Sequence, residues 1–229
     1  MKKLFKLKTL ALSMAMAGSS MAVLAPTAAQ AEVTGNIGMM SQYYFRGAPQ
    51  SPGVSPEFGV DYEHESGLYL GLWSAKVDDA DIEYDIYGGY EVDLSGFVLG
   101  AGFTLYRYLE GNFDTPYDEL NFWAGFGPVT LMLDSGINRK GSAGPDKDES
   151  YTVVSIAAEY EGFYGVVGKG SDFLGKGTDH TWVQLGYSTE IYTDTSIDFS
   201  ILRSSKEATE SGAAETTLLL GINKSFSLM

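Results

Sequence analysis

Residues able to perform acid–base catalysis are scarce in this chain. It has 229 residues with only two histidines, His64 and His180, and no cysteine. His64 lies between two glutamates in an expected turn, and His180 follows Asp179 at the start of an expected strand. An Asp–His pair activates water or a serine hydroxyl in hydrolases, but neighbouring side chains on a strand point to opposite faces. We therefore expect both histidines to be solvated rim residues, and we expect no catalytic residue.

Metal and phosphate chemistry is also weakly represented. Asp78, Asp79 and Asp81 cluster in one loop, but they lack the ligand spacing of a known calcium loop. The segment "GKGSDFLGKGT" lacks the G-x-x-x-x-G-K-[ST] spacing of a phosphate loop, and no helix is expected after it. Without cysteine there is no disulfide and no thiolate ligand. The sequence predicts no bound metal and no cofactor.

Carboxylates spaced two residues apart are the most informative chemical pattern. Rings of carboxylates concentrate cations and repel anions in narrow pores. Three arginines stand against them, each at the outer end of an expected strand. The pore-lining or selectivity candidates are Glu57, Asp61, Glu83, Asp85, Asp134, Asp198, Arg46, Arg107 and Arg203.

The elements that must position these residues are strands, because apolar and polar residues alternate along most of the chain. In "ELNFWAGFG" Leu120 and Phe122 oppose Asn121 and Trp123. The segments are about 9–12 residues long, as a tilted transmembrane strand requires, whereas strands of soluble proteins average about 5–6 residues. The expected strands are 33–45, 56–64, 68–77, 81–92, 96–108, 118–127, 129–138, 150–161, 163–169, 179–189, 195–203 and 215–228.

The connections between these strands alternate between short and long. "ESG", "DLS", "GP" and "EG" are tight turns, whereas "RGAPQSPGVS", "EGNFDTPYD" and "RKGSAGPDKDE" are long and polar. Short periplasmic turns and longer outer loops are typical of an up-and-down outer-membrane barrel. A soluble sandwich or lipocalin-like barrel also alternates, but a barrel of about twelve strands would be hard to fill with inward apolar residues. The sequence predicts an all-β, transmembrane antiparallel barrel of about 12 strands over residues 32–229.

The N-terminal segment and the charge indicate export. Residues 1–31 combine four lysines, an apolar stretch and "AQA" before Glu32, which is the pattern of a cleaved signal peptide. The chain has 30 acidic and 15 basic residues, so its net charge is −15, and it is −19 without the four signal lysines. Nucleic acid is therefore excluded as a partner on electrostatic grounds. No segment after residue 31 is apolar for long enough to form a spanning helix.

Tyrosines beside the short turns suggest an aromatic girdle at a membrane interface. Three hairpins begin with Tyr-Glu and then contain a tight turn with glycine, although tyrosine is also a good strand former in ordinary hairpins. Aromatic residues gather at both interfaces of membrane barrels. The predicted interface aromatics are Tyr43, Phe45, Tyr62, Tyr90 and Tyr160.

The run "SQYYFRG" at residues 41–47 is similar to the S-x-Y-x-F-R-G signature of a family of bacterial outer-membrane proteins. The resemblance continues through "FGVDYEHESGLYLGLWSAKVD" at 58–78. Members of this family are labelled TorF family porins, or the Gcw_chp family. The resemblance implies an outer-membrane barrel with a porin role. Barrels of this kind usually end in an aromatic residue that the assembly machinery reads, whereas this chain ends in Met229.

These observations leave three classes of function open. The first is a porin-like channel for passive diffusion of small hydrophilic, cationic solutes through an acidic lumen. The second is a plugged structural or adhesive barrel, and the third is an outer-membrane enzyme. We expect Arg46 to turn inward and to pair with Glu57 or Asp61, either as a structural brace or as a selectivity element. The expected location is the bacterial outer membrane, and the expected partners are its lipids and lipopolysaccharide, the assembly machinery and small solutes.

Overall fold

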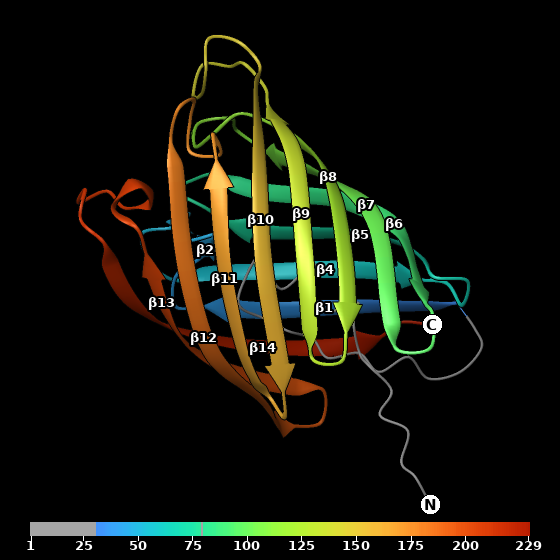
Figure 1. Cartoon of the computed structure of the whole chain (residues 1–229). Helices are drawn as coiled ribbons and strands as arrows, with labels where there is room; N and C mark the ends of the chain where they lie inside the picture. Colours follow the sequence, from blue (N-terminus) through green and yellow to red (C-terminus); the bar gives the residue numbers. More distant parts are fainter. Residues whose placement is uncertain (1–30, 79) are drawn as a thin grey trace, which may run out of the picture.

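The computed structural model describes residues 31–78 and 80–229, and within them twelve antiparallel strands form a closed barrel (Figure 1). Nearly all of the predicted signal peptide, and Asp79, lie outside the described residues. The barrel strands are β1 (Glu32–Met40), β4 (Ser55–Glu63), β5 (Leu68–Lys76), β6 (Ile82–Asp93), β7 (Phe97–Tyr108), β8 (Tyr117–Phe126), β9 (Val129–Asn138), β10 (Glu149–Tyr160), β11 (Phe163–Ser171), β12 (Asp179–Tyr192), β13 (Thr195–Ser204) and β14 (Glu215–Ser227). The predicted all-β antiparallel barrel is confirmed.

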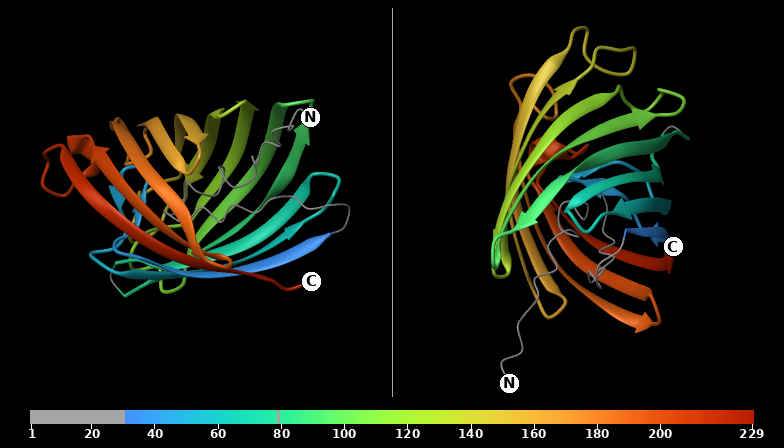
Figure 2. Two further views of the ribbon diagram at one scale, coloured as in Figure 1. Left: turned by 90° about the horizontal axis from the view of Figure 1, so that it is seen from below. Right: turned by 90° about the vertical axis from the view of Figure 1, so that its right-hand side faces the viewer.

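Closure of the barrel depends on β1, which pairs with β4 on one side and with β14 on the other. Thr34 lies opposite both Ser227 and Asp61. A closed barrel has no open sheet edge, so the backbone N–H and C=O groups of its strands are bonded internally. Figures 1 and 2 show steeply tilted strands, so that β9 to β12 cross the β1, β4 and β5 wall behind them. Tilt of this kind accompanies closure of a sheet into a barrel.

The two faces of the strands differ as the sequence pattern predicts. On β8, Phe122 is 45% exposed on the outer face, whereas Trp123 is 5% exposed and points inward. The same alternation exposes Leu131 and Leu133 of β9 on the outer face and buries Met132 and Asp134 on the inner face. The outside is therefore an apolar belt and the inside carries the polar residues, as in transmembrane barrels.

Connections at the two ends of the barrel differ in length. Residues 64–67, 94–96, 127–128, 161–162 and 193–194 form tight turns at one end. Residues 41–54, 77–81, 109–116, 139–148, 172–178 and 205–214 connect the strands at the other end. The last of these contains a single 3₁₀ turn, η1 (Lys206–Ala208). No helix in the described part of the chain has the length and apolar character needed to cross a membrane.

The first strand is shorter than predicted. The expected strand 33–45 ends at Met40, and the chain then forms a separate two-stranded hairpin of β2 (Tyr44–Phe45) and β3 (Ala48–Pro49). Arg46 and Gly47 form its turn with φ values of 51° and 85°, and positive φ at both central residues is typical of a type I′ hairpin. The aromatic run therefore ends at a reversal of the chain instead of leaving the sheet as a strand.

Inward glycines on the strands provide room for large aromatic side chains. A Cβ added to Gly100 would lie 1.9 Å from Trp123 Cε2 on the neighbouring strand, and one on Gly136 would lie 2.2 Å from Tyr151 Cζ. These rings therefore lie flat over a neighbouring backbone. The glycine-rich inner face of the sequence reflects this packing.

We predict that Gly100→Ala destabilises the barrel by about 1–3 kcal/mol, because the added methyl group collides with a ring that the packed interior holds in place. Urea unfolding in lipid vesicles measures the change. The matched control is Gly53→Ala, since no heavy atom lies within 4 Å of a Cβ at that position. Equal stability of the two variants would contradict this account of the glycines.

Candidate functional site

The connection between β1 and β4, residues 41–54, folds back into the barrel, and we call it the inserted loop. Its base is closed by hydrogen bonds from Gln50 N to the Tyr43 carbonyl (2.8 Å) and from Tyr43 N to Ser51 Oγ (2.9 Å). Tyr43, Phe45 and Arg46 are 0%, 6% and 5% exposed. The prediction that Tyr43 and Phe45 are interface aromatics is therefore wrong, because the hairpin carries both of them into the lumen.

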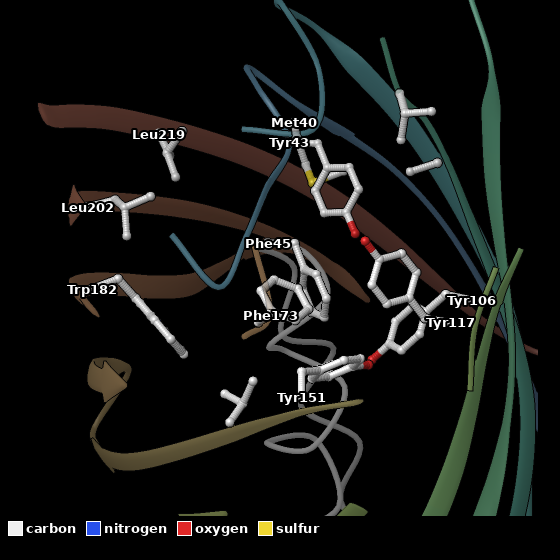
Figure 3. Close-up of a cluster of buried hydrophobic side chains, with 13 residues drawn as sticks. Met40, Tyr43, Phe45, Tyr106, Tyr117, Tyr151, Phe173, Trp182, Leu202 and Leu219 are labelled. Carbon is white, nitrogen blue, oxygen red and sulfur yellow. The ribbon is translucent and has the colours of Figure 1, made fainter. Parts of the chain in front are cut away.

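The inserted loop packs into a buried cluster drawn from most of the barrel wall (Figure 3). Phe45 lies beside Phe173, which comes from the connection between β11 and β12, with ring centroids 5.8 Å apart. Tyr106, at 5.4 Å from Phe45, closes one side, and Figure 3 shows Trp182 on the other. Side chains of the wall and of two connections thus fill the half of the lumen nearest the long loops.

Arg46 forms a buried ion-pair network on the far side of the lumen. Its Nη1 and Nη2 donate to the two carboxylate oxygens of Glu119 on β8, at 2.6 and 2.9 Å, and Nη2 also donates to Asp134 Oδ2 on β9 at 2.8 Å. Asn121 Nδ2 bridges the two carboxylates at 2.6 and 2.9 Å. Bidentate pairs of this kind are geometrically specific and stronger than neutral hydrogen bonds.

The expected pairing of Arg46 with Glu57 or Asp61 is wrong. The chain reverses at residues 46–47, so the side chain points across the lumen and not along β4. Glu119 was not among the predicted residues. It could have been found by extending the alternation of β8 one step back, because Glu119 shares a face with Asn121.

Further hydrogen bonds attach the inserted loop to other strands. His180 Nε2 on β12 donates to the Arg46 carbonyl (3.0 Å), and Ser204 Oγ on β13 donates to the Gly47 carbonyl (2.5 Å). Tyr43 OH donates to Glu83 Oε1 on β6 (2.7 Å). The loop is therefore held from widely separated parts of the wall.

Gly47 is required at the tip of the loop. A Cβ there would lie 2.7 Å from Trp182 Cβ, and the φ of 85° is also unfavourable for other residues. His180 is buried beneath the same turn, so the expectation that it is a solvated rim residue is wrong. His64 lies in an exposed turn, where its Nδ1 is 2.8 Å from Ser66 Oγ.

The inward carboxylates are held by neutral donors. Trp73 Nε1 donates to Glu57 (3.1 Å), and Tyr87 OH donates to Asp61 (2.5 Å). These hydrogen bonds fix the carboxylates without cancelling their charge. The predicted candidates whose side chains point into the lumen are Glu57, Asp61, Glu83, Asp85, Asp134 and Asp198. Glu91, which accepts from Trp123 Nε1 at 2.6 Å, belongs to the same group.

Arg107 and Arg203 face outward, so their expected position in the lumen is wrong. Tyr106 points inward, and the side chain after it on β7 must therefore point out. Arg107 pairs with Asp118 (2.6 Å), and Arg203 donates to Thr216 Oγ1 (2.8 Å) on the outer face. Arg46 is the only buried lysine or arginine in the part of the chain that the structure describes.

The other predicted residues stay apart from this network. Tyr62, Tyr90 and Tyr160 are exposed on the outer face near the short turns, and their role in an aromatic girdle stays a prediction. Within residues 31–78 and 80–229, no group of three or more His, Asp or Glu side chains is arranged to hold a metal ion. The cluster of Asp78, Asp79 and Asp81 includes a residue outside the described part.

A closed twelve-stranded barrel with an apolar outer face and a polar lumen defines a barrel of the outer-membrane porin type. The KdgM porin has the same fold, with a TM-score of 0.55 and 13% identity over 84% of this chain and 99% of that one. The KdgM porin in complex with disordered oligogalacturonate has a TM-score of 0.51 and 14% identity, over 85% of this chain and 99% of that one. A chain solved in work on in-meso crystallization of membrane proteins has a TM-score of 0.59 and 10% identity, over 86% of this chain and 84% of that one.

The chain belongs to the Gcw_chp family, described as bacterial proteins of unknown function, whose profile matches residues 25–226. The resemblance seen in the sequence is therefore confirmed. A comparison with curated protein sequences found no match.

We predict that Arg46→Gln destabilises the protein by about 3–5 kcal/mol, because it leaves two buried carboxylates without their cation. Arg46→Lys should recover only part of this, since an ammonium cannot bind Glu119 through two parallel bonds. Arg203→Gln on the outer face is the control, with an expected change within about 0.5 kcal/mol. Urea unfolding in vesicles gives all three values, and an Arg46→Gln variant as stable as the control would refute the role of the network.

Proposed function

We propose that the protein is an outer-membrane channel for small cationic solutes, in which the inserted loop is the constriction and the present conformation is closed. The observation that carries the proposal is the network of Arg46 with Glu119 and Asp134. It joins the loop to the opposite wall at the level where buried side chains fill the lumen. Passage requires this contact to open.

The charge inside the barrel favours cations. Asp61 on β4 and Glu83 on β6 accept hydrogen bonds from neutral tyrosine hydroxyls, and these bonds do not cancel the negative charge of the carboxylates. Narrow, low-dielectric lumens strengthen the field of such charges and concentrate counter-ions. Once Arg46 leaves its partners, Glu119 and Asp134 add to the same field.

The proposed site of action is the bacterial outer membrane. The apolar belt on the outer face fits the hydrocarbon of a bilayer, and closed barrels satisfy their backbone hydrogen bonds there. Residues 1–31 are the proposed export signal. A protein needs such a signal to leave the cytoplasm before the outer-membrane assembly machinery can insert it. Membrane lipids and lipopolysaccharide are then the molecules in contact with the outer face.

The ligand of the KdgM complex is not carried over to this chain. Oligogalacturonate is a polyanion, and the present lumen is lined mainly by carboxylates with a single buried guanidinium among the described residues. Anions are repelled by such a lining. The shared fold therefore supports a channel without supporting the same solute.

A sealed barrel without transport is the second candidate. Its support is the burial of the loop, whose Tyr43 is fully enclosed and whose contacts reach β6, β8, β9, β12 and β13. No enzymatic family is indicated for the chain. The two barrel functions differ in whether the loop ever leaves the lumen.

Single-channel recording in planar bilayers tests the channel. We expect rare, brief openings for the natural sequence and a several-fold higher open probability for Arg46→Gln, because the loop loses its anchor on β8 and β9. Arg203→Gln should behave like the natural sequence. Silence from all three proteins, each shown to be folded and inserted, would establish the sealed barrel instead.

Reversal potentials under a salt gradient test the charge preference. We expect the open Arg46→Gln channel to select cations, and the additional changes Glu57→Gln and Asp61→Asn to reduce that selectivity while leaving the conductance steps discrete. The control is Asp179→Asn, which removes an acid from the outer face. Anion selectivity, or selectivity unaffected by the inner changes, would contradict an acidic pathway.

A further inference from the structure

A cavity of about 930 Å³ lies above the inserted loop, and no role has been assigned to its lining residues above. Its volume is in the range of about 300–1,000 Å³ that is typical of small-molecule sites. The connections after β7, β9 and β11 form its walls, and the top of the inserted loop closes its base. We call this cavity the vestibule.

The vestibule is lined by aromatic rings. They are Phe45, Tyr106, Tyr108, Tyr117, Tyr151 and Phe173. Several are packed edge to face, with Tyr117 and Tyr151 at 5.8 Å and Tyr151 and Phe173 at 5.2 Å between centroids. Five of the six rings are less than a tenth exposed, so their mutual packing fixes the parts of the rings that border the vestibule.

Two of these rings already hold a cation on their lumen side. The Arg46 guanidinium carbon is 4.6 Å from the centroid of Phe45 and 5.3 Å from that of Phe173. Cations within about 6 Å of a ring centroid are attracted to the negative face of the ring. The tyrosine rings that border the vestibule carry the same negative faces, and Tyr108 is the least buried of them.

Carboxylates without a charged partner stand beside these rings. Asp114 accepts hydrogen bonds from Tyr117 OH (2.9 Å) and from Thr115 N (2.7 Å), which are both neutral donors. Asp146 and Glu149 also line the vestibule, and none of the three forms an ion pair with another described residue.

The basic residues of the vestibule do not balance these acids. Lys176 Nζ lies 3.5 Å from Asp172 Oδ2 in its own loop. Lys147 is therefore the remaining positive charge among the lining residues, which include the carboxylates of Asp114, Asp146 and Glu149. The charge of the wall is therefore negative.

The wall that carries Asp114 is fixed in place. Asp81, before β6, accepts backbone hydrogen bonds from Ile82, Glu110, Asn112 and Phe113 at 2.8–3.3 Å. Although burial acts in the opposite direction, these donors hold the pKa of Asp81 below its usual range. The carboxylate stays ionised at neutral pH and clamps the β7–β8 connection over the vestibule.

From the aromatic lining and the unbalanced carboxylates we infer that the vestibule binds small organic cations, molecules with an ammonium group on an apolar body. The ammonium group lies between Asp114 and the tyrosine faces, and the apolar part lies against Phe45 and Phe173. Neutral molecules gain only the contact with the rings, and anions meet the carboxylates. This binding does not depend on conduction, because a sealed barrel would present the same vestibule.

Calorimetric titration of the folded protein in detergent with benzyltrimethylammonium chloride tests the inference. We expect saturable binding that weakens with added salt, and binding of benzyl alcohol, the neutral comparison, that is at least about tenfold weaker. Asp114→Asn should weaken binding of the cation about tenfold or more and leave binding of benzyl alcohol unchanged. Asp179→Asn, at the same end of the barrel but on the outer face, is the matched control.

A second variant keeps the test decisive if Asp114→Asn does not fold. The double change Asp146→Asn and Glu149→Gln alters only loop-side acids of the vestibule and should also weaken binding of the cation selectively. Absence of binding by the folded natural protein would overturn the inference. Equal binding of the cation and benzyl alcohol, or tighter binding of galacturonate, would overturn it as well. Calorimetry measures binding in the vestibule without any conductance. A negative binding result is therefore distinguishable from a failure of the proposed channel.

Discussion

The buried guanidinium of Arg46 imposes the main constraint on this barrel. A charge removed from water is tolerated only when oppositely charged and hydrogen-bonding partners surround it. Glu119 and Asp134 are these partners, and both carboxylates also accept hydrogen bonds from Asn121. These partners exist only where β8 and β9 lie side by side on the wall facing the inserted loop. This ionic contact, together with the hydrogen bonds to Glu83, His180 and Ser204, holds the loop that fills the lumen and closes the base of the vestibule.

The strands were largely predictable from the sequence because period-two alternation fixes which side chains share a face. Ile82 and Ile86 lie outside and Glu83 and Asp85 inside, as the pattern requires. The misplaced arginine Arg107 could have been corrected by the same rule. A membrane barrel was indicated by the length of the strands and by the alternation of short and long connections, both of which are readable without coordinates.

The inserted loop was not predictable in the same way. The aromatic residues of "YYFRG" favour a continued strand, but Arg46 and Gly47 adopt positive φ values and the chain forms a hairpin there. The partners of Arg46 are 73 and 88 residues away along the chain. Their proximity to Arg46 results from the way the closed barrel brings distant strands together, and a local sequence pattern carries no information about it. The burial of His180 depends on the same inserted loop.

The sequence separation of these contacts has a consequence for biogenesis. The loop emerges immediately after the first barrel strand, yet its backbone is bonded to His180 and Ser204, which lie 134 and 157 residues later. Contacts of such long range carry a large loop-closure entropy and slow folding, and these two require β12 and β13 to be in place. The hairpin can therefore take its final position only after β12 and β13 have been made, although it precedes them in the chain by more than 130 residues.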